Sequence, residues 1–446
     1  MDNATYFKAI KETVKQLENI MKVSIKDRAK DSVKKAMGRS VRTNDPLFWP
    51  AGMLMLGLVS ASEYLDTFDD AREFGDNNAE PHIDAQFAPG TAKDAISPGF
   101  QADINRAAQL NEEIEKVLSK HADLWFYRYK GQIEYVDDAL AGYCFLKMYK
   151  RTGNQKFLVP AKAICDYIIK TPRDEAGSVI YNASRGGKII FADGVGQVTM
   201  FTSEYGKYNI PRNNKSEESM TGDVVNSLAN AFGGVLDKVV GKSEELPSLK
   251  ELETALLANY YKFGRDEKSG LIYHGYELKE KVSYVVDGDD NEQQRRHIEC
   301  YPEKKGLMCW GRAFGWLLMG LSAASDNRAW FEELCDKALE YQRDDGGWSW
   351  QLQAIDGHID MSATGMIAYS IASGLRNNAF SEDKADAMKA AVKKAEACML
   401  SHISEGLVTD TLSSCDDFGV HYQTYGQYPW GQGAVLAALS LWKIAE

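Results

Sequence analysis

One short segment of the chain has the residue types needed to hold an acidic sugar. It reads Trp310-Gly311-Arg312-Ala313-Phe314-Gly315-Trp316 and runs directly into an apolar stretch at 317–321. On a helix, Arg312 and Trp316 share one face because they are four residues apart. An indole packs on the C–H face of a pyranose, and a guanidinium grips a carboxylate through two parallel hydrogen bonds. The segment therefore predicts binding of a sugar acid; the alternative is a buried tryptophan pair around a structural arginine.

Length and composition fit a large globular protein. The chain has 446 residues with 44% hydrophobic content, enough for one extensive core or two smaller ones. Its formal net charge of -12 argues against nucleic acid and anionic membranes as partners, because both require a basic surface. An anionic ligand would therefore need a local basic pocket. The seven cysteines are dispersed and odd in number, which indicates reduced thiols and gives no zinc-ligand spacing.

The sequence contains no run of about 18 apolar residues, so no membrane span is expected. The first residues, Met1 to Ala4, do not begin a signal peptide. We therefore expect a cytoplasmic protein, or a periplasmic one if a cleaved leader is missing from this sequence. The sequence does not indicate an oligomeric state.

Six apolar runs share one design, in which a short motif with an aromatic residue, Asp or Gly opens a helix rich in small residues. They cover 53–58, 139–148, 195–201, 317–321, 365–375 and 433–442. Amphipathic helices with charged faces lie between them, for example Gln155–Lys170, Asp223–Val240, Arg328–Arg343 and Glu382–Leu400. A helix that is apolar all round is buried, and an amphipathic helix covers it. The alternation predicts an all-α fold, an (α/α)6 barrel formed as a single domain over residues 1–446, with a few short loop strands.

Strand signals are limited to stretches such as 188–191 and 284–286. Three irregular stretches, 75–100, 207–221 and 283–306, are longer than ordinary connections, which makes them candidates for walls of a binding cleft. Residues 287–292 look like a calcium loop but lack its central Gly and closing Glu. We interpret them as a solvated loop.

If all inner helices run the same way, their opening motifs gather at one rim, where helix N-termini favour anions. Six candidate side chains would then converge: Asp137, Asp138, Asp193, Trp310, Arg312 and Trp430. The ordinary explanation for an Asp before a helix is N-capping, although a cap needs only one carboxylate and 137–138 supplies two. The ordinary explanation for Trp430 is core packing. His274, between Gly and Tyr residues in a loop or short strand, either faces a ligand or is structural.

These segments resemble the unsaturated uronyl hydrolases of glycoside hydrolase family 105 and the related family 88. Residues 310–316 look like the signature Trp-Gly-Arg-x-x-Gly-Trp, and Gly270-Leu-Ile-Tyr-His-Gly-Tyr276 is similar to Gly-Leu-x-Tyr-His-Gly-Trp. Phe191-Ala-Asp-Gly194 resembles the segment with the catalytic Asp, and 341–348 and 362–366 look like the later hairpin and helix. The resemblance implies an (α/α)6 barrel and places a second active-site Asp at 137 or 138. Two departures concern substrate choice: Ala313-Phe314 replaces Gly and a small polar residue, and 194–197 lacks the usual aromatic residues.

The resemblance also implies a mechanism, in which a 4,5-unsaturated uronic acid left by a polysaccharide lyase is hydrated at its double bond. Asp193 would donate a proton to C4 and then deprotonate the water that adds at C5, which requires a raised pKa from burial or from Asp137 or Asp138 nearby. Arg312 would hold the uronate, Trp310 and Trp316 would line the ring, and His274 would bind a hydroxyl or the water. Trp430 is a further substrate-binding candidate because of its expected place at the rim. No metal or organic cofactor is implied. Two alternatives remain: a conventional glycosidase with two carboxylates acting on a saturated glycan, and an inactive glycan-binding barrel.

Overall fold

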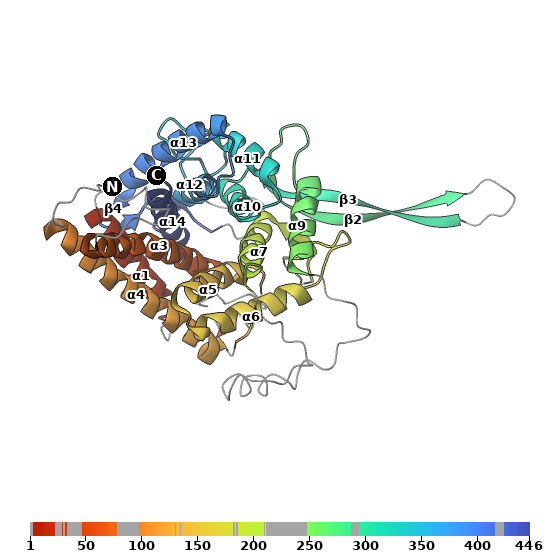
Figure 1. The fold of residues 1–446 in the computed structure, drawn as a ribbon. Coiled ribbons are helices and arrows are strands. Elements are labelled where there is room, and N and C mark those ends of the chain that lie inside the picture. The colour runs from red at the N-terminus through yellow and green to blue at the C-terminus, as the bar shows by residue number, and fades with distance from the viewer. Residues whose placement is uncertain are drawn as a thin grey trace.

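The computed structural model describes residues 3–22, 47–77, 98–129, 135–181, 186–208, 248–286, 294–414 and 423–446, with short pieces at 29, 32–33, 131–133, 183 and 210. Nearly all of its regular structure is helical, and the helices form two concentric layers (Figure 1). No helix in these ranges is both long and apolar enough to cross a membrane. The six cysteines in these ranges are all free thiols.

The inner layer is a closed ring of helices. Its members are α3 (Trp49–Asn77), α5 (Asp138–Thr152), α7 (Ala192–Tyr205), α10 (Gly311–Ala323), α12 (Met361–Arg376) and α14 (Pro429–Ala445). Each packs against the next, and α14 packs back against α3, which closes the ring (Figure 1). These are the six helices expected from the apolar runs, so the barrel prediction is confirmed.

Within the described residues the outer layer also has six helices: α1 (Asn3–Ile20), α4 (Pro98–Tyr129), α6 (Gln155–Lys170), α9 (Leu249–Phe263), α11 (Arg328–Glu340) and α13 (Glu382–Ser401). Each of α4, α6, α9 and α11 packs mainly on one inner neighbour, α13 packs on α12 and more lightly on α14, and α1 packs on both α3 and α14. The predicted helix at 155–170 is confirmed at both ends. The one at 328–343 ends earlier, at Glu340. The helix predicted at 223–240 lies outside the described residues.

Hydrophobic burial explains the two layers. In α14 every residue from Trp430 to Trp442 is buried, whereas α6 buries one stripe of residues that recur at helical spacing. Close helix contacts in the ring depend on glycine, most clearly where α7 crosses α10. A Cβ at Gly196 would lie 2.0 Å from the carbonyl oxygen of Trp316, so no larger residue fits there.

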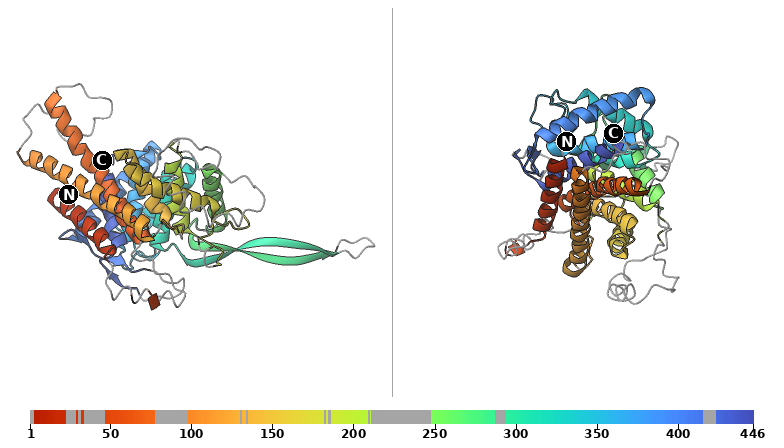
Figure 2. Two further views of the ribbon diagram at one scale, coloured as in Figure 1. Left: turned by 90° about the horizontal axis from the view of Figure 1, so that it is seen from below. Right: turned by 60° about the vertical axis from the view of Figure 1, so that its left-hand side comes forward.

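One sheet stands outside the barrel. Its strands β1 (Ile189–Phe191), β2 (Tyr273–Val286) and β3 (Gln294–Met308) are antiparallel in the order β1-β2-β3. The strands β2 and β3 extend well beyond the helices as a two-stranded arm (Figures 1 and 2). The expectation of an irregular cleft wall at 283–306 is therefore wrong where the structure describes it, because both of its ends belong to the arm. The calcium-like stretch at 287–292 lies outside the described residues.

Two pairs of two-residue strands complete the regular structure, β4 (Ile403–Ser404) with β5 (Leu407–Val408) and β6 (Thr411–Leu412) with β7 (Tyr425–Gly426). The other expected cleft walls, 75–100 and 207–221, lie mostly outside the described residues; their described parts are mainly ends of α3 and α4 and residues after α7.

Candidate active site

The N-terminal ends of the inner helices meet at one rim, as the sequence indicates. The rings of Trp49 on α3 and Trp430 on α14 have centroids 4.8 Å apart. Arg312 on α10 donates to the hydroxyl of Ser362 on α12 over 3.3 Å. Gln197 on α7 donates to Asp137, the residue before α5, over 3.4 Å. These contacts pair the six inner helices at or near their N-terminal ends, α3 with α14, α10 with α12 and α7 with α5.

Asp193 lies in the first turn of α7 and is paired with a histidine from the base of the arm. Its Oδ2 is 2.9 Å from Nε2 of His274, and the two side chains are 19% and 10% exposed. The β1–β2 register, in which Phe191 pairs with Gly275, brings the two residues together. The N-cap of α7 is Phe191, so Asp193 is not a capping residue. A carboxyl group with partial exposure and a hydrogen-bonded imidazole is suited to proton transfer.

A row of aromatic rings leads from His274 along the rim. The imidazole lies 4.6 Å from the Trp310 ring, and the Arg312 guanidinium lies 4.6 Å from Trp310 and 5.6 Å from Trp430. Trp430 in turn stacks on Tyr428, with ring centroids 4.8 Å apart and planes 10° apart. Cation–π contacts with two indoles hold the guanidinium between them. Trp310 and Trp430 are 6% and 7% exposed, so both lie at the edge of the core.

Arg312 does not present an open fork for a carboxylate. Its Nη1 donates to Ser362 Oγ and, over 3.0 Å, to the Leu412 carbonyl, and its Nη2 donates to the Ser413 carbonyl over 2.9 Å. The residue is 2% exposed, and Asp360 lies 3.9 Å from Nη1. The expected grip through both Nη atoms therefore does not match this geometry, because the protein itself uses them. The contacts instead fix the wall formed by residues 411–413.

Asp137 is turned away from its own helix. It occupies the N-cap position of α5 but makes no capping hydrogen bond with its side chain. Its Oδ2 accepts a 2.6 Å hydrogen bond from the Tyr181 hydroxyl, and its Oδ1 accepts the longer one from Gln197. Asp137 is 2% exposed and Asp138, the first residue of α5, is fully buried. Asp137 is linked through Gln197 to the helix that holds Asp193, because Gln197 lies one turn after Asp193 on α7.

Trp316 and the two departures from the family pattern are parts of the packed core. Trp316 is 1% exposed, so a contact between its ring and substrate stays a prediction. Ala313 and Phe314 are also buried. The small residue at Gly194 has a local reason, because a Cβ there would come within 3.0 Å of the Tyr181 ring. Tyr181 thus fills space that a larger residue after Asp193 would need.

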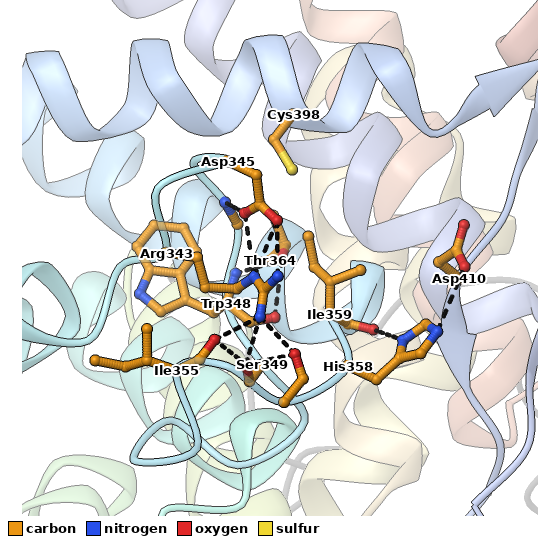
Figure 3. Close-up of polar contacts among 12 residues, drawn as sticks. Arg343, Asp345, Trp348, Ser349, Ile355, His358, Ile359, Thr364, Cys398 and Asp410 are labelled. Atoms are coloured by element: carbon orange, nitrogen blue, oxygen red, sulfur yellow. Dashed lines mark hydrogen bonds and ion pairs between the residues drawn. The ribbon is translucent and has the colours of Figure 1, made fainter.

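The loop between α11 and α12 contacts the wall formed by residues 411–413, since Asp360 at its end accepts a hydrogen bond from the Leu412 N–H. Figure 3 shows the Arg343 guanidinium at its centre, beside Asp345, Ser349 and the carbonyl of Ile355. The same loop bonds to the start of α10, because the Gly311 N–H donates to the Trp350 carbonyl over 2.7 Å. Cys309, just before Trp310, has a positive φ of 53°, a conformation that non-glycine residues seldom adopt. The hydrogen bond from Gly311 to this loop and the strained backbone of Cys309 together fix the position of the Trp310 ring.

Sequence reasoning missed three polar residues at this rim. Asp360 caps α12 and accepts hydrogen bonds from the N–H groups of Ser362 and Leu412 over 2.9 and 3.1 Å. Its position just before an apolar run carries the usual capping signal. Gln197 is a lone amide in an apolar helix, which is also a visible signal. Tyr181 lies in an aperiodic loop, and nothing local marks it.

Comparison with known proteins finds a family model that matches the C-terminal part of the chain. Residues 240–442 match the model of Glycosyl Hydrolase Family 88. The match confirms the resemblance noted at 270–276 and 310–316, and it includes His274 and Trp430. Asp137 and Asp193 precede the matched range. None of the curated proteins matches the chain.

Solved structures show the same fold. One from Klebsiella pneumoniae, described as a possible member of family 105, is 16% identical with a TM-score of 0.55, over 89% of this chain and 82% of that one. A similar protein from Salmonella enterica is 15% identical with a TM-score of 0.53, over 89% and 84%. An unsaturated glucuronyl hydrolase from Streptococcus agalactiae is 11% identical with a TM-score of 0.56, over 100% of this chain and 93% of that one. At these identities the likeness confirms the fold.

Proposed function

We propose that the protein is a glycoside hydrolase that removes a 4,5-unsaturated uronic acid from the non-reducing end of oligosaccharides made by a lyase. The match to Glycosyl Hydrolase Family 88 supports the class of enzyme. A structural neighbour that is itself an unsaturated glucuronyl hydrolase supports the substrate class. We take residues 1–446 as one catalytic unit, since the inner ring joins helices from both ends of the chain.

One observation favours hydration over conventional hydrolysis. Of the four acidic residues at the rim, Asp193 has a side chain that is 19% exposed, whereas Asp137 is 2% exposed and Asp138 and Asp360 are fully buried. A conventional glycosidase needs two carboxyl groups that both reach the sugar. Hydration of a vinyl ether needs one group that first donates and then accepts a proton. The exposure of a single carboxyl group supports the second chemistry.

The proposed reaction uses Asp193 twice. Its protonated carboxyl group gives a proton to C4 of the enoate, and positive charge develops at C5. The carboxylate then takes a proton from a water whose oxygen bonds to C5. The resulting hemiketal opens, the ring oxygen leaves C5 and stays on C1, and C1 expels the next sugar with its own glycosidic oxygen. One water is consumed, and Asp193 ends the cycle protonated.

The remaining residues bind and orient in this proposal. His274 holds Asp193 through Nε2 and faces the water or a sugar hydroxyl. Trp310 and Trp430 provide the apolar surface for the sugar ring, with Trp316 behind them. Arg312 acts through the two indoles and the 411–413 wall that it holds. We assign Asp137 an electrostatic role beside Asp193.

The test uses oligosaccharides from a polysaccharide lyase, together with the same oligosaccharides reduced at the double bond. Loss of the conjugated enoate absorbance is followed as the new sugar end is released. We expect both to occur together, one deuterium on C4 when the reaction runs in deuterium oxide, and no cleavage of the reduced substrate. Cleavage of the reduced substrate would establish conventional hydrolysis, and binding without turnover would establish a glycan-binding protein.

A further inference from the structure

The loop between α11 and α12 contains a short ribbon at residues 348–360. Its two halves are joined by backbone hydrogen bonds, from the Trp350 N–H to the His358 carbonyl over 3.2 Å and from the Asp360 N–H to the Trp348 carbonyl over 3.0 Å. These bonds give the ribbon a defined backbone shape up to the start of α12, which Asp360 caps.

The ribbon holds the backbone on both sides of Trp310. The N–H of Leu352 donates to the Cys309 carbonyl over 3.0 Å, and the N–H of Gly311 donates to the Trp350 carbonyl over 2.7 Å. A Cβ on Gly311 would come within 2.7 Å of the ribbon backbone, so the two segments are in close contact. The positive φ of Cys309 persists only because its surroundings determine it. The place of the Trp310 ring therefore depends on the shape of the ribbon.

The guanidinium of Arg343 holds the turn of the ribbon closed. Its Nη1 donates to the carbonyls of Ile355 and Gly357 and, over 3.2 Å, to the Ser349 hydroxyl (Figure 3). The carboxylate of Asp345 accepts bonds from Nε over 3.0 and 3.2 Å and lies 2.9 Å from Nη2, which fixes the plane of the guanidinium. A guanidinium presents its N–H donors in one fixed plane, so it sets the positions of the acceptors around it. Both halves of the ribbon are thereby tied to one side chain.

We propose that Arg343 is a positioning residue that sets the place of the Trp310 ring, and through it the affinity of the site for the uronate. Arg343 acts through the ribbon and its bonds to Cys309 and Gly311, without touching the substrate. A gap of about 1 Å already removes up to about half of a dispersion contact, so a small shift of the indole is enough to weaken binding. Asp193 lies on α7, outside the ribbon, so kcat should depend on Arg343 much less than KM does. The inference rests on the proposed function, which takes Trp310 as a surface for the sugar.

The test compares kcat and KM of Arg343→Lys and Asp345→Asn, with lyase-made oligosaccharides as substrate. Lysine keeps a positive charge beside Asp345 but lacks the planar fork for the carbonyls, so the KM should rise about tenfold while kcat stays within about threefold. Asp345→Asn leaves the donors of Arg343 on the ribbon carbonyls and should raise the KM less than about threefold. The matched control is Arg173→Lys. Arg173 also donates to two backbone carbonyls, those of Ile168 and Ile169 at the end of α6, and this change should leave both constants unmoved.

A double variant tests whether Arg343 acts through Trp310. Trp310→Leu removes the indole and should itself raise the KM about tenfold; adding Arg343→Lys should then raise it by less than about twofold, because the ring that Arg343 positions is gone. Each variant is assayed well below its melting temperature, so that folded proteins are compared. Additive rises, an unchanged KM, or an equal rise in Arg173→Lys would overturn the role of Arg343. If the unmodified protein does not consume the enoate at all, the proposed function fails instead, and the two failures are therefore distinct.

Discussion

Nε2 of His274 lies 2.9 Å from Oδ2 of Asp193 at the rim, although the two residues are 81 positions apart in the chain. The pair exists because β1, which leads directly into α7, is hydrogen-bonded to the base of β2 in the arm. The acid of the proposed reaction is thus held by a residue from outside the helical ring.

Replacing Asp193 by Asn tests that acid directly. The amide keeps the shape of the side chain but transfers no proton, so kcat should fall by about three orders of magnitude. Folding, measured by circular dichroism, and substrate binding, measured by calorimetry, should change little. Asp123→Asn on the outer helix α4 is the control. Activity within tenfold of the unmodified protein would exclude Asp193 as the proton donor.

Replacing Arg312 by Lys tests the wall at 411–413. Lysine has no planar fork for the Leu412 and Ser413 carbonyls and stacks poorly between two indoles, so the KM should rise about tenfold and the melting temperature should fall. The same change at Arg151, which grips Asp66 through two bonds far from the rim, is the matched control. A lower melting temperature with an unchanged KM would limit Arg312 to a structural role.

A partly buried ion cluster away from the rim should make stability depend on pH. Lys147 lies 2.6 Å from Glu63, and Arg376 bonds the same carboxylate over 2.9 Å. Burial alone would raise the pKa of Glu63, but Lys147 and Arg376 outweigh it and lower the pKa. Burial likewise raises the pKa of Glu204, and the charge of Lys147 lowers it; the net effect is a lowered pKa. The stabilisation is present above the ordinary Glu pKa and is lost as pH falls below it.

Lys147→Met should therefore lower the free energy of unfolding by roughly 2–3 kcal/mol at pH 7, because it leaves Glu63 with one partner fewer. Denaturant unfolding between pH 7 and pH 3 should show a smaller fall in stability for this variant than for the unmodified protein. Lys156→Met removes an exposed pair with Asp123 and should cost less than about 1 kcal/mol. Equal pH dependence in all three proteins would contradict the role of the cluster.

Much of the fold could be predicted from the sequence, because a fully buried helix is apolar on all sides and a surface helix is apolar on one side only. The run at 433–442 has no polar face, which places it in the inner layer. The run at 155–170 has one polar face, which places it in the outer layer. The arm was harder to recognise. Tyr276 and Leu278 alternate with exposed or half-exposed Lys279 and Lys281, a true strand pattern, but charge dominates the stretch.

The sequence predicts which residues belong to the site better than it predicts which contacts they make. Asp193, His274 and Trp310 were found from residue type and motif, and the structure brings them together. The role of Arg312 could not be read, because a guanidinium suits a carboxylate and a backbone carbonyl equally well. Tyr181 could not be found, since its importance comes from a contact with a residue 44 positions away.

Ring closure between α3 and α14 gives the rim a place in the order of folding. Trp49 and Trp430 belong to opposite ends of the described chain, and contacts between such distant segments carry a high loop-closure cost. On the ribosome, α14 emerges after every other described helix. Asp193 and His274 are therefore synthesised before Trp430, and the proposed sugar-binding wall is complete only after α14 has joined the ring.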